Sequence, residues 1–248
     1  MRYFFEIAYK GTNYHGWQIQ KNTVSVQQVL TEKLSTILNE NVTITGSGRT
    51  DTGVHARQQY FHVNIIQKVN ALQLMNQLNS FLPSDISIRS IREVAASAHA
   101  RFDATRRTYE YWIINHKDPF LDDVAYRYTK YLDIENMNEA ASILPGEKDF
   151  KSFSKIKTDV NHFICEVFEA KWNTKNGILI FRISANRFLR GMVRAITGTL
   201  LDIGTRNKKV DDMHVILQSG DRKASGRSVP AKGLCLTEVY YPREIFIT

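Results

Sequence analysis

The chain contains little cysteine and no long uninterrupted run of apolar residues. Its 248 residues include two cysteines, Cys165 and Cys235, which do not form a CxxC motif. This spacing argues against a disulfide framework and against a cysteine zinc site. No segment approaches the roughly 20 apolar residues of a membrane span, and the alternating N-terminus lacks the apolar core of a signal peptide. We therefore expect a cytoplasmic protein that does not enter a membrane.

Acidic residues are fewer than basic residues. The 33 Lys and Arg residues exceed the 25 Asp and Glu residues, which gives a formal charge of +8. Such an excess favours a polyanionic partner, although a merely basic protein would show the same charge. Segments 101–107 and 187–194 combine several arginines with aromatic residues. This combination suits a surface that binds phosphates and stacks bases.

Hydrophobic periodicity predicts the same order of elements in both halves of the chain. The first half is expected to form a strand at 2–9, a helix at 26–39, strands at 41–45 and 59–66, a helix at 71–81 and a strand at 85–94. The second half is expected to form a strand at 107–115, a helix at 134–144, strands at 164–172 and 178–185, helices at 188–203 and 210–218, and a strand at 233–241.

Each half resembles the split βαβ, ferredoxin-like pattern. We therefore predict an α+β fold with two ferredoxin-like halves, residues 1–100 and 101–248, and mostly antiparallel sheets. Helices would cover one face of each sheet. A ligand would bind on the other sheet face or in an active-site cleft between the halves.

Local signals support several of these elements. Ser25 and Gln28 have the spacing of a capping box at the start of the first helix. Asp133 is a suitable N-cap for the helix at 134–144. Asn176 and Gly177 between two strands predict a tight hairpin turn.

The most unusual local sequence is GSGRTDTGVHA at residues 46–56, which connects two predicted strands. Its glycines allow backbone angles that other residues resist, and they surround the carboxylate of Asp51 and the guanidinium of Arg49. Functional side chains are often displayed on such connections. The alternative is a plain turn in which Asp51 caps its own backbone.

A lone carboxylate restricts the chemistry that this segment can perform. No second acid is evident near Asp51, so the two-carboxylate arrangement of most glycosidases is not supported. A single aspartate can still act as a covalent nucleophile. Burial in a base-binding pocket would raise its pKa from about 3.9, and a nearby arginine would lower it by about 1–3 units. This chemistry therefore requires a buried arginine, and the sequence itself does not choose between Arg190 and Arg194.

A tyrosine pair occurs on the strand at 107–115. Tyr109 and Tyr111 point to the same face of that strand because side chains alternate along it. One of them would then be a core residue while the other stacks on a base or moves a proton. Two core tyrosines are the alternative.

Several segments together resemble the tRNA pseudouridine synthase A family. The segment GRTDTGVHA at 48–56 is similar to the family's catalytic motif. Four further segments match in family order, namely YKGTNYHGWQ at 9–18, HARF at 99–102 with RTYEY at 107–111, the segment 188–198 and AKGLCL at 231–236. The bacterial pattern usually has alanine in place of Thr52, a difference that leaves Asp51 and Arg49 unchanged.

The resemblance implies a role for each of five residues. Asp51 would attack the target nucleoside, and Arg194 would pair with Asp51 and keep it ionised. Tyr109 would contact the flipped base, Arg49 would hold the RNA, and Leu234 would pack beneath the base. No metal ligand is implied.

The resemblance also implies the reaction and its partners. The family isomerises uridine to pseudouridine at positions 38–40 of the tRNA anticodon stem-loop, without organic cofactor or metal, and it forms homodimers. The target nucleotide must be flipped out of a helix, which costs a few kcal/mol. Asp51 would attack C1′ of the ribose, add to C6 of the uracil, or remove a C2′ proton to give a glycal, and the sequence does not decide among these routes.

Two other functions remain alternatives. A noncatalytic RNA-binding module would explain the charge and the fold, but not the segment at 48–56. A metal-dependent hydrolase would use some of the seven histidines. His55 and His62 lie seven residues apart across a loop and a strand, which favours surface or supporting roles for them.

Overall fold

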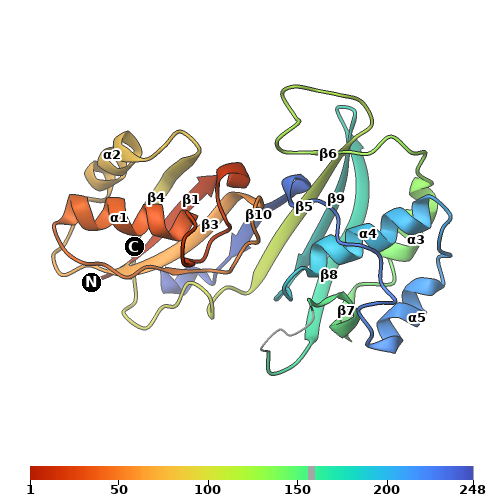
Figure 1. The fold of residues 1–248 in the computed structure, drawn as a ribbon. Coiled ribbons are helices and arrows are strands. Elements are labelled where there is room, and N and C mark those ends of the chain that lie inside the picture. Colours follow the sequence, from red (N-terminus) through yellow and green to blue (C-terminus); the bar gives the residue numbers. More distant parts are fainter. Residues whose placement is uncertain (156–159, 248) are drawn as a thin grey trace. The chain divides into compact units, whose positions relative to one another are not determined.

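The computed structural model describes residues 1–155 and 160–247, and the chain divides into two compact units (Figure 1). The first unit contains Met1–Arg106 and Cys235–Thr248, and the second contains Arg107–Leu234. This division differs from the expected halves, which assigned the whole C-terminal segment to the second half. The C-terminal strand is assigned to the first unit because it pairs with a strand there.

The first unit is an α+β structure with a mostly antiparallel sheet. Its elements are β1 (Arg2–Tyr9), α1 (Val26–Leu38), β2 (Thr45–Gly46), β3 (His55–Asn64), α2 (Ala71–Phe81), β4 (Ile86–Val94) and β10 (Leu234–Tyr240). The strand order is β4-β1-β3, and β2 pairs with β3. All of these pairs are antiparallel, whereas Cys235 and Leu236 of β10 pair in parallel with the start of β3. This is the split βαβ order that the sequence predicts, with an added parallel strand.

The first helix shows how much of the predicted cap is present. The Ser25 hydroxyl accepts a hydrogen bond from the backbone N–H of Gln28 at 3.2 Å. In a reciprocal capping box the Gln28 side chain would also accept a hydrogen bond from the Ser25 N–H. Here the Gln28 side chain reaches along the helix, and its Nε2 donates to Glu32 Oε1 at 2.9 Å. The prediction of a reciprocal capping box is therefore wrong, although the N-cap itself is confirmed.

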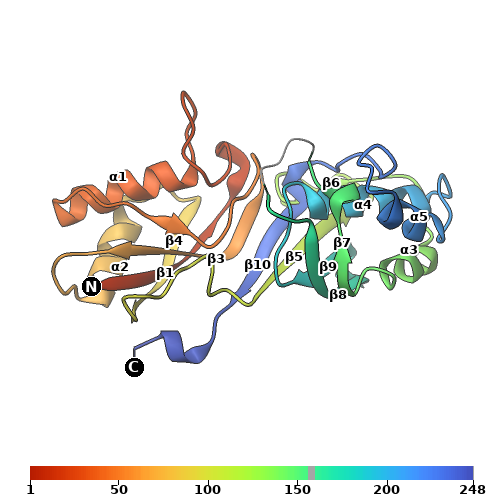
Figure 2. The ribbon, with the colours of Figure 1, turned by 90° about the horizontal axis from the view of Figure 1, so that it is seen from below.

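The sheet face opposite α1 is covered rather than open in the first unit. Figure 2 shows the C-terminal segment on this side of the strands. Tyr241 packs edge-on against Phe4 of β1, with ring centroids 5.2 Å apart, and Phe246 packs on the same ring at 6.1 Å. Tyr241 also contacts Tyr60 of β3 at 5.1 Å. The expectation that this sheet face is free for a ligand is wrong here, because apolar side chains of β1 and β3 bury against the chain's own end.

The second unit is also a mostly antiparallel α+β structure. Its elements are β5 (Arg106–Ile114), β6 (Tyr126–Arg127), α3 (Ile134–Ala141), β7 (Gly146–Asp149), β8 (Ile164–Lys175), β9 (Ile178–Ala185), α4 (Met192–Gly204) and α5 (Asp212–Ser219). The strand order is β5-β9-β8-β7, with β6 parallel to β5. Both views place α3, α4 and α5 on one side of β8 and β9 (Figures 1 and 2).

Two local predictions in the second unit are confirmed. Asp133 caps α3, since its side chain accepts a hydrogen bond from the Asn136 N–H at 3.2 Å. Asn176 and Gly177 form the hairpin turn between β8 and β9 with φ angles of 51° and 75°. These positive angles are those of a two-residue turn that matches the twist of its strands.

The helix at 188–203 begins later than predicted. Gly191 has a φ of 76°, in the left-handed region, and α4 therefore starts at Met192. Arg190 is left outside the helix, whereas Arg194 lies in its first turn. Nearly all of α4 is buried, and it packs against α3. No helix in the described part of the chain is long and apolar enough to cross a bilayer.

Candidate active site

The loop that carries Asp51 is held by the backbone of the opening segment. The Trp17 N–H donates to the Thr50 carbonyl at 3.3 Å, and the Gly53 N–H donates to the Tyr14 carbonyl at 3.3 Å. Gly16 makes this contact possible. Its φ is +80°, and a Cβ atom there would lie 2.3 Å from the Thr50 oxygen. The two segments that resemble family motifs at 9–18 and 48–56 are thus neighbours in space.

Buried polar side chains hold the same loop from the sheet side. The Tyr9 hydroxyl donates to Gln59 Oε1 at 2.8 Å and shares a hydrogen bond with Thr50 Oγ1 at 2.9 Å. Gln59 Nε2 in turn donates to the Gly48 carbonyl at 3.2 Å. The sequence analysis missed Gln59, and it gave Tyr9 no role beyond its place in the strand at 2–9 and in the segment at 9–18. The available signal was a glutamine that directly precedes Tyr60 and Phe61 at the start of a predicted strand.

The glycines of the loop are required for different reasons. Gly46 lies against the Trp17 ring, where a Cβ atom would be 2.5 Å from the ring atoms. Gly53 has a φ of 79°. Gly48 has open space around it, so the structure gives no steric reason for glycine there. Glycine is therefore required at position 53 for its backbone angle, as predicted. At position 46 it is required because the Trp17 ring leaves no space for a side chain.

Asp51 is half-buried at the tip of this anchored loop, while Arg49 is exposed. The Val54 N–H donates to the backbone carbonyl of Asp51 at 3.1 Å. This bond closes the turn through the main chain and does not use the carboxylate. Because hydrogen bonds hold the backbone of this loop on several sides, the loop can present the Asp51 carboxylate from a fixed position. A nucleophile needs such an arrangement.

Arg194 is half-buried in the first turn of α4. Its Nε donates to the Val229 carbonyl at 2.7 Å, and the Val229 N–H donates back to the Arg194 carbonyl at 3.2 Å. Arg190, the competing candidate, is exposed. Arg187 is half-buried and lies 3.1 Å from Nε2 of His162. Of these arginines, Arg194 is the one whose position is fixed by α4 and by a second segment.

The two tyrosines of β5 have different surroundings. Tyr111 is fully buried, its hydroxyl donates to the Pro230 carbonyl at 2.8 Å, and burial raises its pKa well above the usual value. Tyr109 is half-buried and meets Phe188 edge to face, with ring centroids 5.2 Å apart. Tyr111 is thus the core residue, whereas Tyr109 lies at a partly exposed position.

The five predicted residues are divided between the two units. Asp51 and Arg49 belong to the first unit, whereas Tyr109, Arg194 and Leu234 belong to the second. Leu234 is buried, and it is both the first residue of β10 and the last residue of the second unit, because the rest of β10 belongs to the first unit. Within the second unit, Arg194 and Leu234 are connected through one segment. Val229 of this segment bonds to Arg194, and Leu234 follows Val229 a few residues later.

The two histidines of the metal-hydrolase alternative are buried and have backbone partners. His55 Nδ1 accepts from the Gly11 N–H at 2.9 Å, and His62 Nδ1 accepts from the Ala100 N–H at 3.1 Å. Within residues 1–155 and 160–247, no group of three or more His, Cys, Asp or Glu side chains could hold a metal ion.

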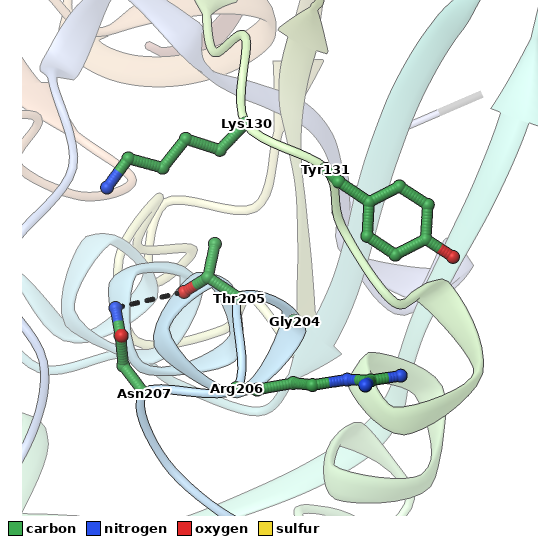
Figure 3. Close-up of a pocket in the computed structure, with 6 residues that line it drawn as sticks. All are labelled: Lys130, Tyr131, Gly204, Thr205, Arg206 and Asn207. Carbon is green, nitrogen blue, oxygen red and sulfur yellow. Dashed lines mark hydrogen bonds between the residues drawn. The ribbon is translucent and has the colours of Figure 1, made fainter.

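A pocket of about 370 Å³ lies elsewhere in the second unit. It is lined by Lys130, Tyr131, Gly204, Thr205, Arg206 and Asn207 (Figure 3). Asn207 donates to the Thr205 hydroxyl at 3.1 Å beside it. Gly204 is the last residue of α4, ten residues after Arg194, and the helix rises about 1.5 Å per residue. The pocket therefore lies about 15 Å along the helix from Arg194 and contains no predicted site residue.

Comparison with known proteins gives full-length matches. A family model described as tRNA pseudouridine synthase matches residues 7–103 and 140–242. A "tRNA pseudouridine synthase A" from Porphyromonas gingivalis is 45% identical over 250 residues, covering 99% of both chains. The protein of the same name from Bacteroides thetaiotaomicron is 46% identical over 248 residues, covering 99% of this chain and 92% of that one. Another from Caldicellulosiruptor saccharolyticus is 38% identical, covering 95% and 97%.

One solved structure also matches, titled "Crystal Structure of a Cbf5-Nop10-Gar1 Complex". The match has a TM-score of 0.36 and 11% sequence identity, and it covers 94% of this chain and 57% of the other. A likeness at this level supports no conclusion about the chain.

Proposed function

This chain belongs to the tRNA pseudouridine synthase family, and from that premise we propose that Asp51 is its nucleophile and the anticodon stem-loop its target. Membership makes the chain an isomerase that acts on uridine in tRNA. Within that activity, the specific uridines are those at positions 38–40. In this proposal the first unit contributes Asp51 and the second contributes its arginine partner.

The observation that carries this proposal is the fixed backbone around Asp51. Two separate parts of the first unit bond to its loop, the opening segment through Tyr14 and Trp17 and β3 through Gln59. A loop of this length would otherwise populate many conformations, and ordering each residue costs about 1–2 kcal/mol. Anchoring is useful when one side chain must be held within about 0.5 Å of its reacting partner. Asp51 is the only ionisable side chain of this loop that is half-buried, because Arg49 is exposed.

The reaction depends on one nucleophile and on an enclosed uracil. It depends less on a set of proton donors and acceptors. The N1–C1′ bond of uridine breaks, the uracil turns, and a C5–C1′ bond forms. N1 gains a proton and C5 loses one, so the product is an isomer of the substrate. A carboxylate that adds to C1′ or C6 supplies the electron pair for the first bond change, and it leaves again when the second bond forms.

Arg194 supplies the positive charge that keeps Asp51 ionised. A carboxylate enclosed with a nucleobase loses hydration, which favours its neutral form. An arginine opposes this effect because it remains charged and presents a planar fork to a carboxylate. Arg194 fits the role since its half-buried position is fixed by the bond from Nε to Val229.

Three further residues bind the substrate in this proposal. Tyr109 stacks on the flipped base from the partly open position beside Phe188. Leu234 packs beneath the base, where a buried aliphatic side chain excludes water. The exposed Arg49 contacts the RNA backbone and helps to offset the cost of flipping the nucleotide.

Substitution of Asp51 tests the nucleophile directly. Asp51→Asn keeps the shape of the side chain and removes its charge, so pseudouridine formation should fall by more than about 1,000-fold in kcat. Binding of tRNA should change by less than about tenfold, since Asp51 makes no favourable contact with phosphate. The measurement is single-turnover pseudouridine formation together with filter binding of tRNA.

Thr52→Ala is the matched control, because Thr52 is exposed, adjacent to Asp51 and usually alanine in the family pattern. This variant should retain wild-type kcat. If Asp51→Asn still converts uridine at a comparable rate, the nucleophile assignment is wrong.

An isotope experiment distinguishes the three routes open to Asp51. In the glycal route Asp51 removes the proton from C2′, so a substrate deuterated at C2′ should react several-fold more slowly. Attack at C1′ or C6 leaves that C–H bond intact, and kcat should then be nearly unchanged.

Two properties of the intact protein complete the proposal. The chain acts as a homodimer, which places more of the basic surface against one tRNA, and it works in the cytoplasm, where thiols such as those of Cys165 and Cys235 stay reduced. Sedimentation equilibrium tests the first point. A homodimer has twice the mass of the 28.6 kDa chain, and a monomer at micromolar concentration would contradict it.

A further inference from the structure

We propose that Arg222 is a positioning residue for Arg194, acting through the segment at residues 225–229. The inference rests on the proposed function, because it takes Arg194 to be the partner of Asp51. Arg222 touches neither substrate nor Asp51 in this proposal. It fixes the segment whose Val229 carbonyl receives Nε of Arg194.

The guanidinium group of Arg222 donates hydrogen bonds to three residues of this segment. Its Nη1 donates to Ser225 Oγ at 2.8 Å and to the Gly226 carbonyl at 3.1 Å. Its Nη2 donates to Ser228 Oγ at 3.0 Å. A planar fork with several donors can hold three acceptors in one fixed arrangement, whereas a lysine ammonium is a compact point charge on a flexible stem.

The segment at residues 225–229 packs closely against the backbone of α4. The Gly226 N–H donates to Thr199 Oγ1 at 2.8 Å, and a Cβ atom on Gly226 would lie 2.6 Å from the Thr199 nitrogen. On the helix side, a Cβ atom on Gly198 would lie 1.8 Å from the Arg227 carbonyl oxygen. Glycines on both surfaces permit a direct contact between backbones, so a shift of the segment is transmitted to its next residues.

The next residues end on Arg194 itself. The Val229 carbonyl accepts from Nε of Arg194 at 2.7 Å, and the Val229 N–H donates to the Arg194 carbonyl at 3.2 Å. Because a guanidinium is planar, a fixed Nε–H also fixes the plane and direction of the two Nη groups. The position of Val229 thus helps to set the direction of the Arg194 fork, and a carboxylate requires that fork to be aligned.

The chemistry of Arg222 favours a purpose beyond filling space. All the oxygen atoms that it contacts among the described residues are neutral. Partial burial lowers the pKa of its guanidinium below the usual value. Taking a charge partly out of water has a cost unless it is hydrogen-bonded. The charge is retained where it can hold three acceptors at once, which an apolar residue cannot do.

Arg222→Met and Arg222→Lys test the proposal, with Lys223→Met as the control for the loss of one positive charge. Lys223 is the adjacent, exposed residue. Arg222→Met should lower kcat at saturating tRNA by about tenfold or more, with KM changed by less than about threefold. Arg222→Lys should fall between Arg222→Met and wild type. Lys223→Met should keep the wild-type kcat.

The pH dependence of kcat separates positioning from general destabilisation. A misdirected Arg194 stabilises the Asp51 carboxylate less, so the acid limb of kcat should move to higher pH in Arg222→Met. A merely structural role would lower the melting temperature and the folded fraction without moving this limb. Ser228→Ala removes one acceptor at an exposed position, and it should move the limb in the same direction by a smaller amount. Ser228→Ala and Arg222→Lys carry the test if Arg222→Met does not fold.

Arg194→Met distinguishes the two ways in which the inference can fail. If Arg194→Met loses activity while the Arg222 and Ser228 variants keep wild-type kcat and acid limb, the positioning role is wrong and the proposed function stands. If Arg194→Met itself has wild-type kcat and acid limb, Arg194 does not serve Asp51, and both proposals for these arginines are overturned.

Discussion

Burial gives neighbouring residues of one strand different functions. Tyr109 and Tyr111 lie two residues apart on β5, and alternation places them on the same face. Tyr111 bonds to Pro230 and is fully enclosed, while Tyr109 keeps part of its ring accessible beside Phe188. The sequence specifies the face but not the depth, because depth depends on which distant segment packs over each ring.

His62 shows the same effect on protonation. It is buried on β3, and the loss of hydration lowers its pKa to about 4. The positive charges of His99 and Arg2 act in the same direction, and Asp103 opposes them. In the unfolded chain the pKa of histidine is about 6.5. Between these two pH values the unfolded state binds more protons than the folded state.

The free energy of unfolding should therefore fall as the pH decreases from about 6.5 to about 4, and level off below that range. We expect His62 to contribute a loss of about 1–2 kcal/mol, which allows for solvent screening of the shift. Urea denaturation at a series of pH values measures it. His62→Asn keeps an acceptor for the Ala100 N–H but does not titrate, so this variant should show a flatter profile. An equally steep profile in His62→Asn would assign the effect to other groups.

At the scale of elements, the loop that carries Asp51 depends on a contact between two segments that are separated by about 30 residues in sequence. Gly16 has a φ of +80° and meets the Thr50 carbonyl, so any side chain there faces both backbone strain and a collision. Gly177 in the β8–β9 hairpin has nearly the same φ, +75°, and a Cβ atom there would meet nothing within 4 Å. Alanine substitutions at Gly16 and Gly177 therefore separate two contributions to the free energy of unfolding, namely the strain of the backbone angle and the collision with Thr50.

Gly177→Ala should lower the free energy of unfolding by about 1 kcal/mol, which is the cost of a left-handed alanine. Gly16→Ala should lower it by about 2–4 kcal/mol, because the loop must also move away from Thr50. Only Gly16→Ala should reduce kcat, by about tenfold or more, since it displaces the residue next to Asp51. Chemical denaturation and single-turnover assays measure the two effects. Equal losses of activity in both variants would show that the contact has no special role.

Local patterns predict the elements whose signals lie within a few residues. The cap at Asp133 and the Asn176–Gly177 turn are examples, since each depends on hydrogen bonds or backbone angles within the segment itself. The strand predicted at 41–45 is reduced to Thr45–Gly46, although Val42 and Ile44 are buried. Apolar alternation indicates burial there, but pairing with β3 is limited to two residues.

Long-range pairing is the part that the sequence could not supply. β3 begins at His55 and not near residue 59, because its first residues pair with β1 and with β10 from the far end of the chain. β7 was not predicted, since its residues GEKD have no apolar alternation and pair with the edge of β8. Gln59 was missed for a related reason, because its partners, Tyr9 and Gly48, come from different segments.

At the scale of the whole molecule, charge and specificity arise from different features. The formal charge of +8 attracts any nucleic acid, and it carries no information about which uridine is modified. In the proposed mechanism, specificity requires that one nucleotide of the tRNA leave its helix and reach Asp51, and flipping this nucleotide out costs a few kcal/mol. Only positions where the surrounding phosphates meet fixed arginines can offset that cost. The proposed targets at positions 38–40 form one short stretch of the anticodon stem-loop, as this geometric limit requires.

Deletion of the gene should therefore remove pseudouridine from tRNA positions 38, 39 and 40 and leave pseudouridine at other tRNA positions unchanged. A single fixed site reaches a short run of adjacent nucleotides by small shifts of the stem, whereas a distant arm would need a different docking surface. Mapping of pseudouridine in total tRNA from the deleted strain measures this outcome. Wild-type protein should restore all three positions, and Asp51→Asn should restore none. Loss of pseudouridine in another arm of the tRNA would contradict the anticodon stem-loop assignment, because no contact at positions 38–40 would then explain it.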